Sequence, residues 1–448
     1  MNTTVDATMD SIEVKKDAQL SAFIRSAFYE PWREKIKAIK GCAQPVNLAG
    51  AFQLVDKRTG EIRHDYSGQI MAPCGTRRAA LCPSCAARYA EDAFHLIRAG
   101  LSGDDSKGVP ASVRRAPRLV LTLTAPSFGK VHSRSITKTG KVVPCACGEA
   151  HRGADTRVST PIDPDSYDYE HAVLWHANAG KLWHRFTIAL QRRLAVAGGI
   201  PVREFKNHAK VSYSKVAEYQ KRGMIHFHAI IRVDGPDGPG SEVPGWITDE
   251  VLTSVMVDAV KAVEVIVHRP DRSELVLRFG EQVKPEPITV DNTRDGKGEQ
   301  TLAGYVAKYA TKSSGVTDSG VDRRVKSREH IEALDINPHF KRMMLTAWDL
   351  GEREQYAHLN LHKWTHMLGF RGHFLTKSKA YSTTFTQLRR ARQLHRYSEL
   401  LTELDVSEDD ITVINHWELT SVGHKNDAQR ELAAAIANTH LTTNSIRE

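Results

Sequence analysis

The chain has 448 residues, a formal net charge of +9 and a sequence pI of about 9.1. This length allows two or three domains with cores of their own. The sequence has no apolar run of membrane-spanning length, and its polar N-terminus excludes a signal or transit peptide, so we expect a cytoplasmic protein with no membrane partner. The positive charge fits a polyanionic partner but does not identify one.

Five of the six cysteines fall in two tight groups, a pattern that in a reducing compartment is more typical of metal ligands than of disulfides. The first group contains a C-x2-C pair, whose turn lets two thiolates reach one ion, and zinc requires four such ligands. We therefore predict one structural Zn²⁺ site that draws on both groups, with its fourth ligand left open, and we interpret Cys42 as an isolated thiol. The predicted ligands are Cys74, Cys82, Cys85, Cys145 and Cys147, with His151 as the alternate.

Residues 118–124 alternate leucines with Val120, Thr122 and Thr124, which predicts a central strand with hydroxyl groups on one face. Residues 169–197 have the pattern of a long amphipathic helix that could cover the apolar face of such a sheet.

The stretch G-M-I-H-F-H-A-I-I-R-V-D, residues 223–234, places apolar residues at every second position, the period of a strand with one buried face. His226 and His228 therefore project together from the other face. Two imidazoles on one side of a rigid strand form half of a divalent-metal site. The simpler interpretation is a strand with two polar residues on its solvent side.

A strand is also predicted at residues 210–220, followed by a tight turn, Lys221-Arg222-Gly223. A three-residue hairpin loop with Gly223 in the left-handed conformation would place Glu218 directly opposite His226. Glu218 then becomes the third ligand of a site that suits Mn²⁺, or Mg²⁺ when a phosphate adds oxygen ligands. A four-residue loop would bring in Gln220 instead, so Gln220 is the alternate ligand.

Residues 301–312, T-L-A-G-Y-V-A-K-Y-A-T-K, contain the pattern Y-x-x-K twice in helical register. Each tyrosine thus has a cation within one turn, which could stabilise a phenolate or hold a phosphate. The alternative interpretation is structural: both tyrosines would simply pack at the rim of an amphipathic helix. The residues concerned are Tyr305 with Lys308 and Tyr309 with Lys312.

Residues 371–396 combine arginines and lysines with aromatic residues and contain no acidic residue, a composition suited to backbone and base-stacking contacts with DNA. A solvated basic helix is the alternative interpretation. Across the chain, the candidate DNA-binding residues are Arg77, Arg78, Arg222, Lys377, Lys379, Arg389 and Arg390.

Three stretches, in this order, resemble the motif set of rolling-circle replication initiators of the HUH endonuclease superfamily. L-T-L-T-A-P-S-F-G is similar to the first motif, H-F-H to the histidine motif and G-Y-V-A-K-Y-A-T-K to the tyrosine motif. The resemblance is closer still to actinobacterial plasmid replication initiators, through the cysteine-rich region, V-A-E-Y-Q-x-R-G-x-x-H-F-H and T-A-W-D-L-G. It covers most of residues 70–400.

The resemblance implies a strand-specific DNA nickase that opens and closes a plasmid origin by tyrosine transesterification, with a 5′-phosphotyrosine intermediate and a free 3′ hydroxyl. It favours Tyr309 as the nucleophile, with Tyr305 as the second tyrosine of a two-tyrosine scheme. The partners that the resemblance implies are origin DNA and the host helicase, DNA polymerase and single-strand-binding protein. A separate helicase is expected because the sequence has no Walker-type G-x4-G-K-[ST] motif.

Three rival functions remain open: a relaxase or transposase of the same superfamily, a non-catalytic zinc-dependent DNA-binding regulator, and a small-molecule metalloenzyme of the cupin kind. A cupin would need a further strand histidine and would leave the paired tyrosines and the basic region unexplained.

We expect an α+β fold with a mainly antiparallel central sheet, flanking helices, a small zinc-binding subdomain and a basic helical C-terminal region. The predicted regions are a helical arm (1–50), a Cys-rich zinc-binding region (51–165) that overlaps the first nuclease strand (118–124), an HUH nuclease core (166–325) and a DNA-binding or accessory region (326–448).

Overall fold

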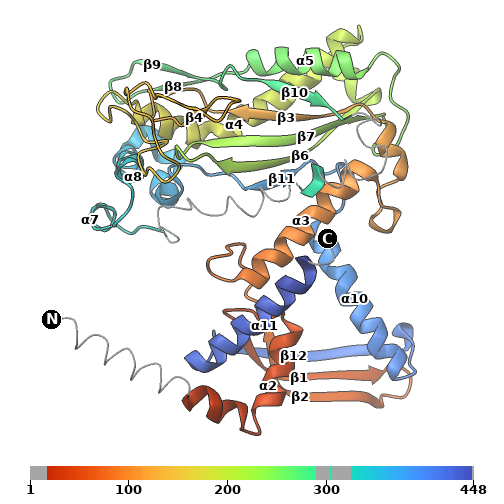
Figure 1. Ribbon diagram of the computed structural model, residues 1–448. Helices are drawn as coiled ribbons and strands as arrows, with labels where there is room; N and C mark the ends of the chain where they lie inside the picture. The colour runs from red at the N-terminus through yellow and green to blue at the C-terminus, as the bar shows by residue number, and fades with distance from the viewer. Residues whose placement is uncertain (1–17, 289–301, 305, 307–323, 446–448) are drawn as a thin grey trace, which may run out of the picture. The chain divides into compact units, whose positions relative to one another are not determined.

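The computed structural model describes residues 18–288, 302–304, 306 and 324–445. These residues form two compact units (Figure 1). The central unit is Ala93–Thr383, and the terminal unit combines Met1–Asp92 with Thr384–Glu448.

A five-stranded antiparallel sheet forms the centre of the central unit, with strand order β10-β3-β7-β6-β11. The sheet strands are β3 (Arg118–Thr124), β6 (Lys210–Tyr219), β7 (Ile225–Asp234), β10 (Lys284–Pro287) and β11 (Leu375–Lys377). Two small hairpins are β4 (Ser135–Ile136) with β5 (Val142–Val143), and β8 (Val265–His268) with β9 (Glu274–Leu277).

Helices surround this sheet, and the longest of them, α4, lies across one of its faces (Figure 1). The α-helices are α4 (Tyr169–Ala197), α5 (Asp249–Lys261), α7 (Arg328–Glu332), α8 (Pro338–Gly351) and α9 (Leu361–Trp364), while α3 (Pro83–Ser102) begins in the terminal unit. The 3₁₀ turns are η1 (Asp105–Lys107), η2 (Ala111–Arg115), η3 (Val202–Asn207), η5 (Glu354–Leu359) and η6 (Thr365–Met367).

The core lies between α4 and the apolar face of the sheet. The alternation in the sequence decides this face, because Leu121 and Leu123 of β3 and Phe227 of β7 are fully buried in one cluster with Phe186 and Leu190 of α4. The residues between them along the strands are therefore left on the opposite face, where the polar side chains gather.

Helix starts follow local capping chemistry, in which a side-chain oxygen accepts an otherwise unpaired backbone N–H. Asp168 accepts from the His171 N–H at the start of α4, and Asn337 accepts from the His339 N–H at the start of α8. These caps fix where each helix leaves its preceding loop.

Two fully buried arginines join the sheet to the end of α3. Arg232 forms an ion pair with Asp234, with Nε and Oδ1 2.7 Å apart, and also donates to the Gly100 carbonyl. Arg118 donates to the Leu101 carbonyl. The last carbonyls of α3 thus receive charged donors, an arrangement that stabilises a helix C-terminus.

The terminal unit contains a three-stranded antiparallel sheet of order β12-β1-β2. Helix α10 packs on one end of this sheet, where Leu54, Leu401 and Ile411 are buried together. The elements are α2 (Tyr29–Ala38), β1 (Val46–Asp56), β2 (Ile62–Ala72), α10 (Phe385–Glu403), η7 (Glu408–Asp410), β12 (Ile411–Val422) and α11 (Asp427–Ser445).

The α+β class and the antiparallel central sheet with flanking helices are confirmed. The compact units, however, cut across the four consecutive regions predicted from the sequence, because β12 pairs with β1 and so joins the two ends of the chain in one sheet. Among the described residues, no helix is both long enough and apolar enough to cross a bilayer.

A buried lysine makes the stability of the central unit depend on pH. Lys215 points from β6 into the apolar core, with its Nζ 4.1 Å from the centroid of the Phe227 ring and 5.0 Å from that of Trp183. Burial lowers the pKa of Lys215 to about 7, against an ordinary value of 10.5. Between these values the unfolded chain binds a proton that the folded chain does not, so stability rises with pH.

We therefore expect the free energy of unfolding of the wild type to rise, relative to Lys215→Met, by about 1.4 kcal/mol per pH unit between about pH 7 and pH 10. Urea denaturation of both proteins across this window measures the difference. Equal pH slopes in the two proteins would contradict a neutral buried amine.

Candidate metal centre and its surroundings

The hairpin between β6 and β7 has the geometry predicted from the sequence. Gly223 has φ +75°, and the Gln220 N–H donates to the Met224 carbonyl over 2.8 Å. Glu218 consequently pairs with His226 across the two strands. Directly opposed residues share a face of the sheet, so the carboxylate and the two imidazoles converge.

Glu218, His226 and His228 form a triangle of ligand atoms. The Glu218 Oε2 atom lies 2.8 Å from His226 Nε2 and 3.4 Å from His228 Nε2, and the two imidazole nitrogens are 3.2 Å apart. Adjacent ligands of an octahedral ion bound at about 2.1 Å lie about 3.0 Å apart, so the three atoms fit one divalent cation. Two imidazole nitrogens and one carboxylate oxygen placed in this way could hold one divalent metal ion.

The neighbouring strand β3 orients the second histidine. Thr122 pairs with His228 and Thr124 with His226, which places both hydroxyl groups on the metal-binding face as expected. The Thr122 Oγ1 atom lies 3.2 Å from His228 Nδ1, a contact that leaves Nε2 facing the other two ligands. Burial lowers the pKa of His228 and so favours the neutral imidazole that binds metals.

His176 of α4 binds the backbone of Ile225, the first residue of β7. Its Nε2 accepts the Ile225 N–H over 3.0 Å, and its Nδ1–H donates to the Leu368 carbonyl over 2.8 Å. Complete burial lowers the pKa of His176 to about 4, so the ring stays neutral. His176 thereby fixes the backbone of Ile225, the residue directly before His226. The sequence did not point to His176, because helix periodicity alone gives a histidine on an apolar face no particular role.

The turn itself is fixed by Arg222. Its guanidinium donates to the carbonyls of Ala125 (2.9 Å) and Pro126 (3.0 Å), just beyond β3, and to the Gln220 side chain (2.9 Å). His339 Nε2–H donates in turn to the Arg222 carbonyl over 3.1 Å. The Gln220 side-chain oxygen therefore accepts a hydrogen bond from Arg222, and Arg222, a predicted DNA contact, links the hairpin to the end of β3.

The cysteines fall into two separate groups in the structure, and not into the predicted single group. Cys42 joins the first group, with its Sγ 3.8 Å from that of Cys82 and 3.7 Å from that of Cys85. A zinc ion about 2.3 Å from each sulfur places sulfurs about 3.8 Å apart, so these distances fit. The interpretation of Cys42 as an isolated thiol was wrong, because packing of the segment after α2 against the start of α3 brings it into the cluster. The complete first group is Cys42, Cys74, Cys82 and Cys85.

The second cysteine group lies in the other compact unit. Cys145, Cys147 and His151 are grouped with His132, a residue that the sequence analysis did not select. The prediction that they complete the first site is corrected: each group supplies four donors of its own.

The predicted nucleophiles and their cations lie outside the described residues. These are Tyr305, Lys308, Tyr309 and Lys312. Of the neighbouring residues, 302–304 are helical, and Ala303 and Val306 are fully buried. Their roles stay predictions.

The candidate DNA-binding side chains differ in how accessible they are. Lys377 is half-buried and donates to the carbonyls of Ser378 and Ser382, which occupies its ammonium group. Arg78 is also half-buried. The exposed members of the set are Arg77, Lys379, Arg389 and Arg390.

Two of these exposed arginines also have aromatic or acidic neighbours. The Arg77 guanidinium lies 4.8 Å from the centroid of the Tyr89 ring. Arg389 lies 5.9 Å from the centroid of Phe385, with its Nε 3.8 Å from Asp92.

Comparison with known proteins indicates the family of the chain. The model of a family described as RepSA, "Replication initiator protein, pSAM2", matches residues 28–438. A curated replication initiator protein from Streptomyces ambofaciens is 40% identical over an alignment of 433 residues that covers 94% of this chain and 92% of the relative. No solved structure matches the chain.

The support beneath the hairpin can be tested at Gly223. A Cβ there would lie 2.8 Å from the Phe340 ring and 3.1 Å from Leu368, in addition to the strain of a positive φ. Gly199 is the matched control, because its φ is +64° and a Cβ would meet nothing within 4 Å. We expect Gly199→Ala to lower the free energy of unfolding by about 1 kcal/mol and Gly223→Ala by about 2–4 kcal/mol.

Only Gly223→Ala should also weaken Mn²⁺ binding, as measured by calorimetry, because only that hairpin positions His226. Equal effects of the two substitutions on stability and on Mn²⁺ binding would contradict the packing argument.

Proposed function

Since the chain belongs to the RepSA family of replication initiator proteins, we propose that it starts plasmid replication by nicking one strand of origin DNA and later rejoining it. The observation that carries this proposal is the convergence of Glu218, His226 and His228 on one face of the central sheet. A regulator that only binds DNA would not require such a ligand triangle.

The three side chains would hold a Mg²⁺ or Mn²⁺ ion, which when bound supplies Lewis-acid polarisation of the scissile phosphate. The negative charge of Glu218 and the two neutral imidazoles leave a net positive site for that phosphate once the ion is present. Thr122 holds the His228 ring, and His176 holds the backbone before His226, so the ligands are preorganised by the sheet.

We assign the chemical step to Tyr309. Its phenolate oxygen forms a bond to phosphorus while the bond from phosphorus to the 3′ oxygen breaks, and the proton lost by the phenol ends on the 3′ oxygen. The products are a 5′-phosphotyrosine and a free 3′ hydroxyl, and the reverse reaction rejoins the strand without ATP. Lys308 and Lys312 would stabilise the phenolate or hold the phosphate, and Tyr305 would serve as the second nucleophile.

The free 3′ hydroxyl is a primer for the host DNA polymerase, and unwinding falls to a host helicase, because the sequence contains no Walker-type phosphate-binding motif. The displaced strand would require single-strand-binding protein. Origin DNA would be held through its phosphates by the exposed cations among those predicted, which are Arg77, Lys379, Arg389 and Arg390.

Covalent-adduct formation tests the proposal. Purified protein is incubated with labelled single-stranded origin DNA and Mn²⁺ or Mg²⁺, and the protein–DNA adduct is measured. We expect His226→Ala to lower the adduct at least about 100-fold, because it removes a metal ligand. His208→Ala, an exposed histidine of the same unit, is the control and should match the wild type. Absence of an adduct across a full set of origin strands, or an undiminished adduct in His226→Ala, would overturn the nickase assignment.

The nucleophile is identified by comparing Tyr309→Phe with Tyr305→Phe on the same substrate. We expect Tyr309→Phe to abolish the first cleavage and Tyr305→Phe to retain it while impairing strand closure, since the removed hydroxyl is the attacking group in each case. Peptide mapping of the adduct gives an independent answer. First cleavage that survives in Tyr309→Phe would show that the nucleophile is a different residue.

A further inference from the structure

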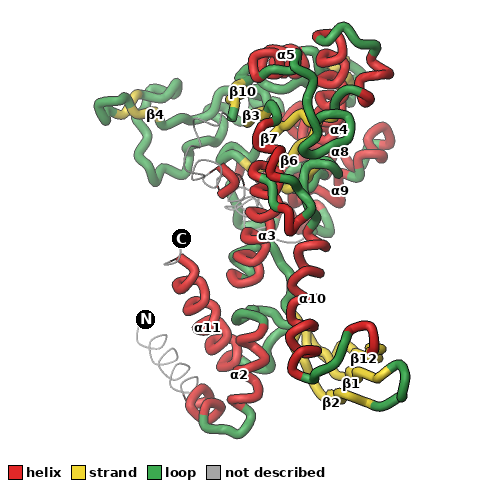
Figure 2. The backbone as a smooth tube through the Cα atoms, turned by 90° about the vertical axis from the view of Figure 1, so that its right-hand side faces the viewer, coloured by secondary structure: helices red, strands yellow, loops and turns green. Residues whose placement is uncertain are grey.

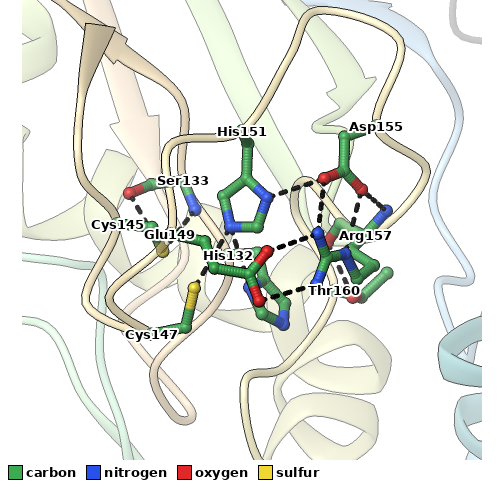
Figure 3. A network of polar contacts seen from close by, with 9 residues as sticks. All are labelled: His132, Ser133, Cys145, Cys147, Glu149, His151, Asp155, Arg157 and Thr160. Atoms are coloured by element: carbon green, nitrogen blue, oxygen red, sulfur yellow. Dashed lines mark hydrogen bonds and ion pairs between the residues drawn. The ribbon is translucent and has the colours of Figure 1, made fainter.

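The segment between β3 and α4 folds around four metal-binding side chains that belong to neither the ligand triangle nor the Cys42 cluster (Figure 3). They are His132, Cys145, Cys147 and His151, and their donor atoms lie within 4.8 Å of one another. We propose that this group is a second structural zinc site, with the Cys₂His₂ ligand set typical of that ion.

Two stretches of the chain, one at His132 and one from Cys145 to His151, bring the ligands together. A turn at Cys145 is closed by the Gly148 N–H, which donates to the Cys145 carbonyl over 2.8 Å while Gly148 has φ +92°. This turn lets both thiols face inward. His132 arrives on an extended stretch that is paired with the returning chain, since its N–H donates to the Thr160 carbonyl and its carbonyl accepts the Ser159 N–H, both over 2.8 Å.

The distances fit a tetrahedral ion. His132 Nδ1 lies 3.1 Å from His151 Nε2, and Cys147 Sγ lies 3.3 Å from the same nitrogen. Zinc bound about 2.0–2.1 Å from nitrogen and about 2.3 Å from sulfur gives edges of roughly 3.3–3.8 Å. The observed separations of 3.1 and 3.3 Å lie just below that range and at its short end, so one ion fits after small outward adjustments of the side chains.

A second layer of contacts orients the ligands. His151 Nδ1–H donates to Asp155 Oδ2 over 2.8 Å, which turns Nε2 toward the thiols. Arg157 holds Asp155 and Glu149 through contacts of 2.9 and 2.7 Å (Figure 3). A carboxylate bound to the outer nitrogen of a histidine is the usual support of a zinc ligand.

The Cys145 sulfur has a support of its own. The Ser133 N–H donates to Cys145 Sγ over 3.2 Å, a contact that favours the thiolate form required of a zinc ligand.

The segment has no apolar core that could replace the ion. From 130 to 160, a stretch described in full, Cys145 and His151 are the buried residues, and both are proposed ligands. Figure 2 shows the chain around β4 extending away from the sheet. A protruding segment without buried apolar side chains requires a cross-link or a metal to hold one conformation.

Metal content tests the proposal in the full-length protein. We expect two zinc ions per chain in the wild type, by inductively coupled plasma mass spectrometry, and one in Cys145→Ser/Cys147→Ser. The matched control Cys42→Ser/Cys85→Ser should also retain one, held by the second site. Replacement of zinc by Co²⁺ should add the absorption bands of an S₂N₂ site to those of an S₄ site. One zinc per chain in the wild type, unchanged by Cys145→Ser/Cys147→Ser, would overturn the proposal.

Thiol alkylation of the wild type tests the same zinc site without any substitution, so it does not depend on the folding of a variant. Cys147 is only half-buried, so without an ion it is open to iodoacetamide. We expect mass spectrometry to find Cys147 protected as purified and modified at least about tenfold faster after chelation of zinc. Equal modification rates before and after chelation would show that no metal is bound there.

Discussion

The antiparallel pairing of β3, β7 and β6 is the constraint on which the rest of the candidate centre depends. Because side chains alternate along a strand, the buried faces of these strands commit Thr122, Glu218 and both histidines to the opposite face. A slip of one residue would move the carboxylate into the core and the apolar side chains to the surface. Burial of the apolar face therefore stabilises the ligand geometry and the fold together.

The helices contribute by fixing the ends of those strands. His176 of α4 binds the backbone directly before His226, and His339 of α8 binds the turn that joins the two strands. Burial lowers the pKa of each histidine to about 4, so neither changes charge near neutral pH. These two histidines thus support the metal-binding face as neutral, hydrogen-bonded groups.

The sequence predicted the register of the β6–β7 hairpin, because the information that sets this register is local. One turn with a left-handed glycine sets the pairing of Glu218 with His226, and a two-residue period decides which side chains face the core. Contacts between distant segments were not predictable in this way. The approach of Cys42 to Cys74 and the pairing of β1 with β12 both result from tertiary packing. No periodicity or spacing in the sequence indicates these contacts. His132 was missed for the same reason, since it reaches Cys145 through a loop and not through a short motif.

We propose that Glu218, His226 and His228 bind one divalent cation that serves DNA strand cleavage. Anomalous X-ray diffraction from crystals of the protein with Mn²⁺ and an origin oligonucleotide tests it most directly. We expect one manganese peak about 2.2 Å from Glu218 Oε2 and from both Nε2 atoms, with a phosphate oxygen among its remaining ligands. Crystals that contain bound DNA but show no manganese peak at Glu218, His226 and His228 would contradict this proposal.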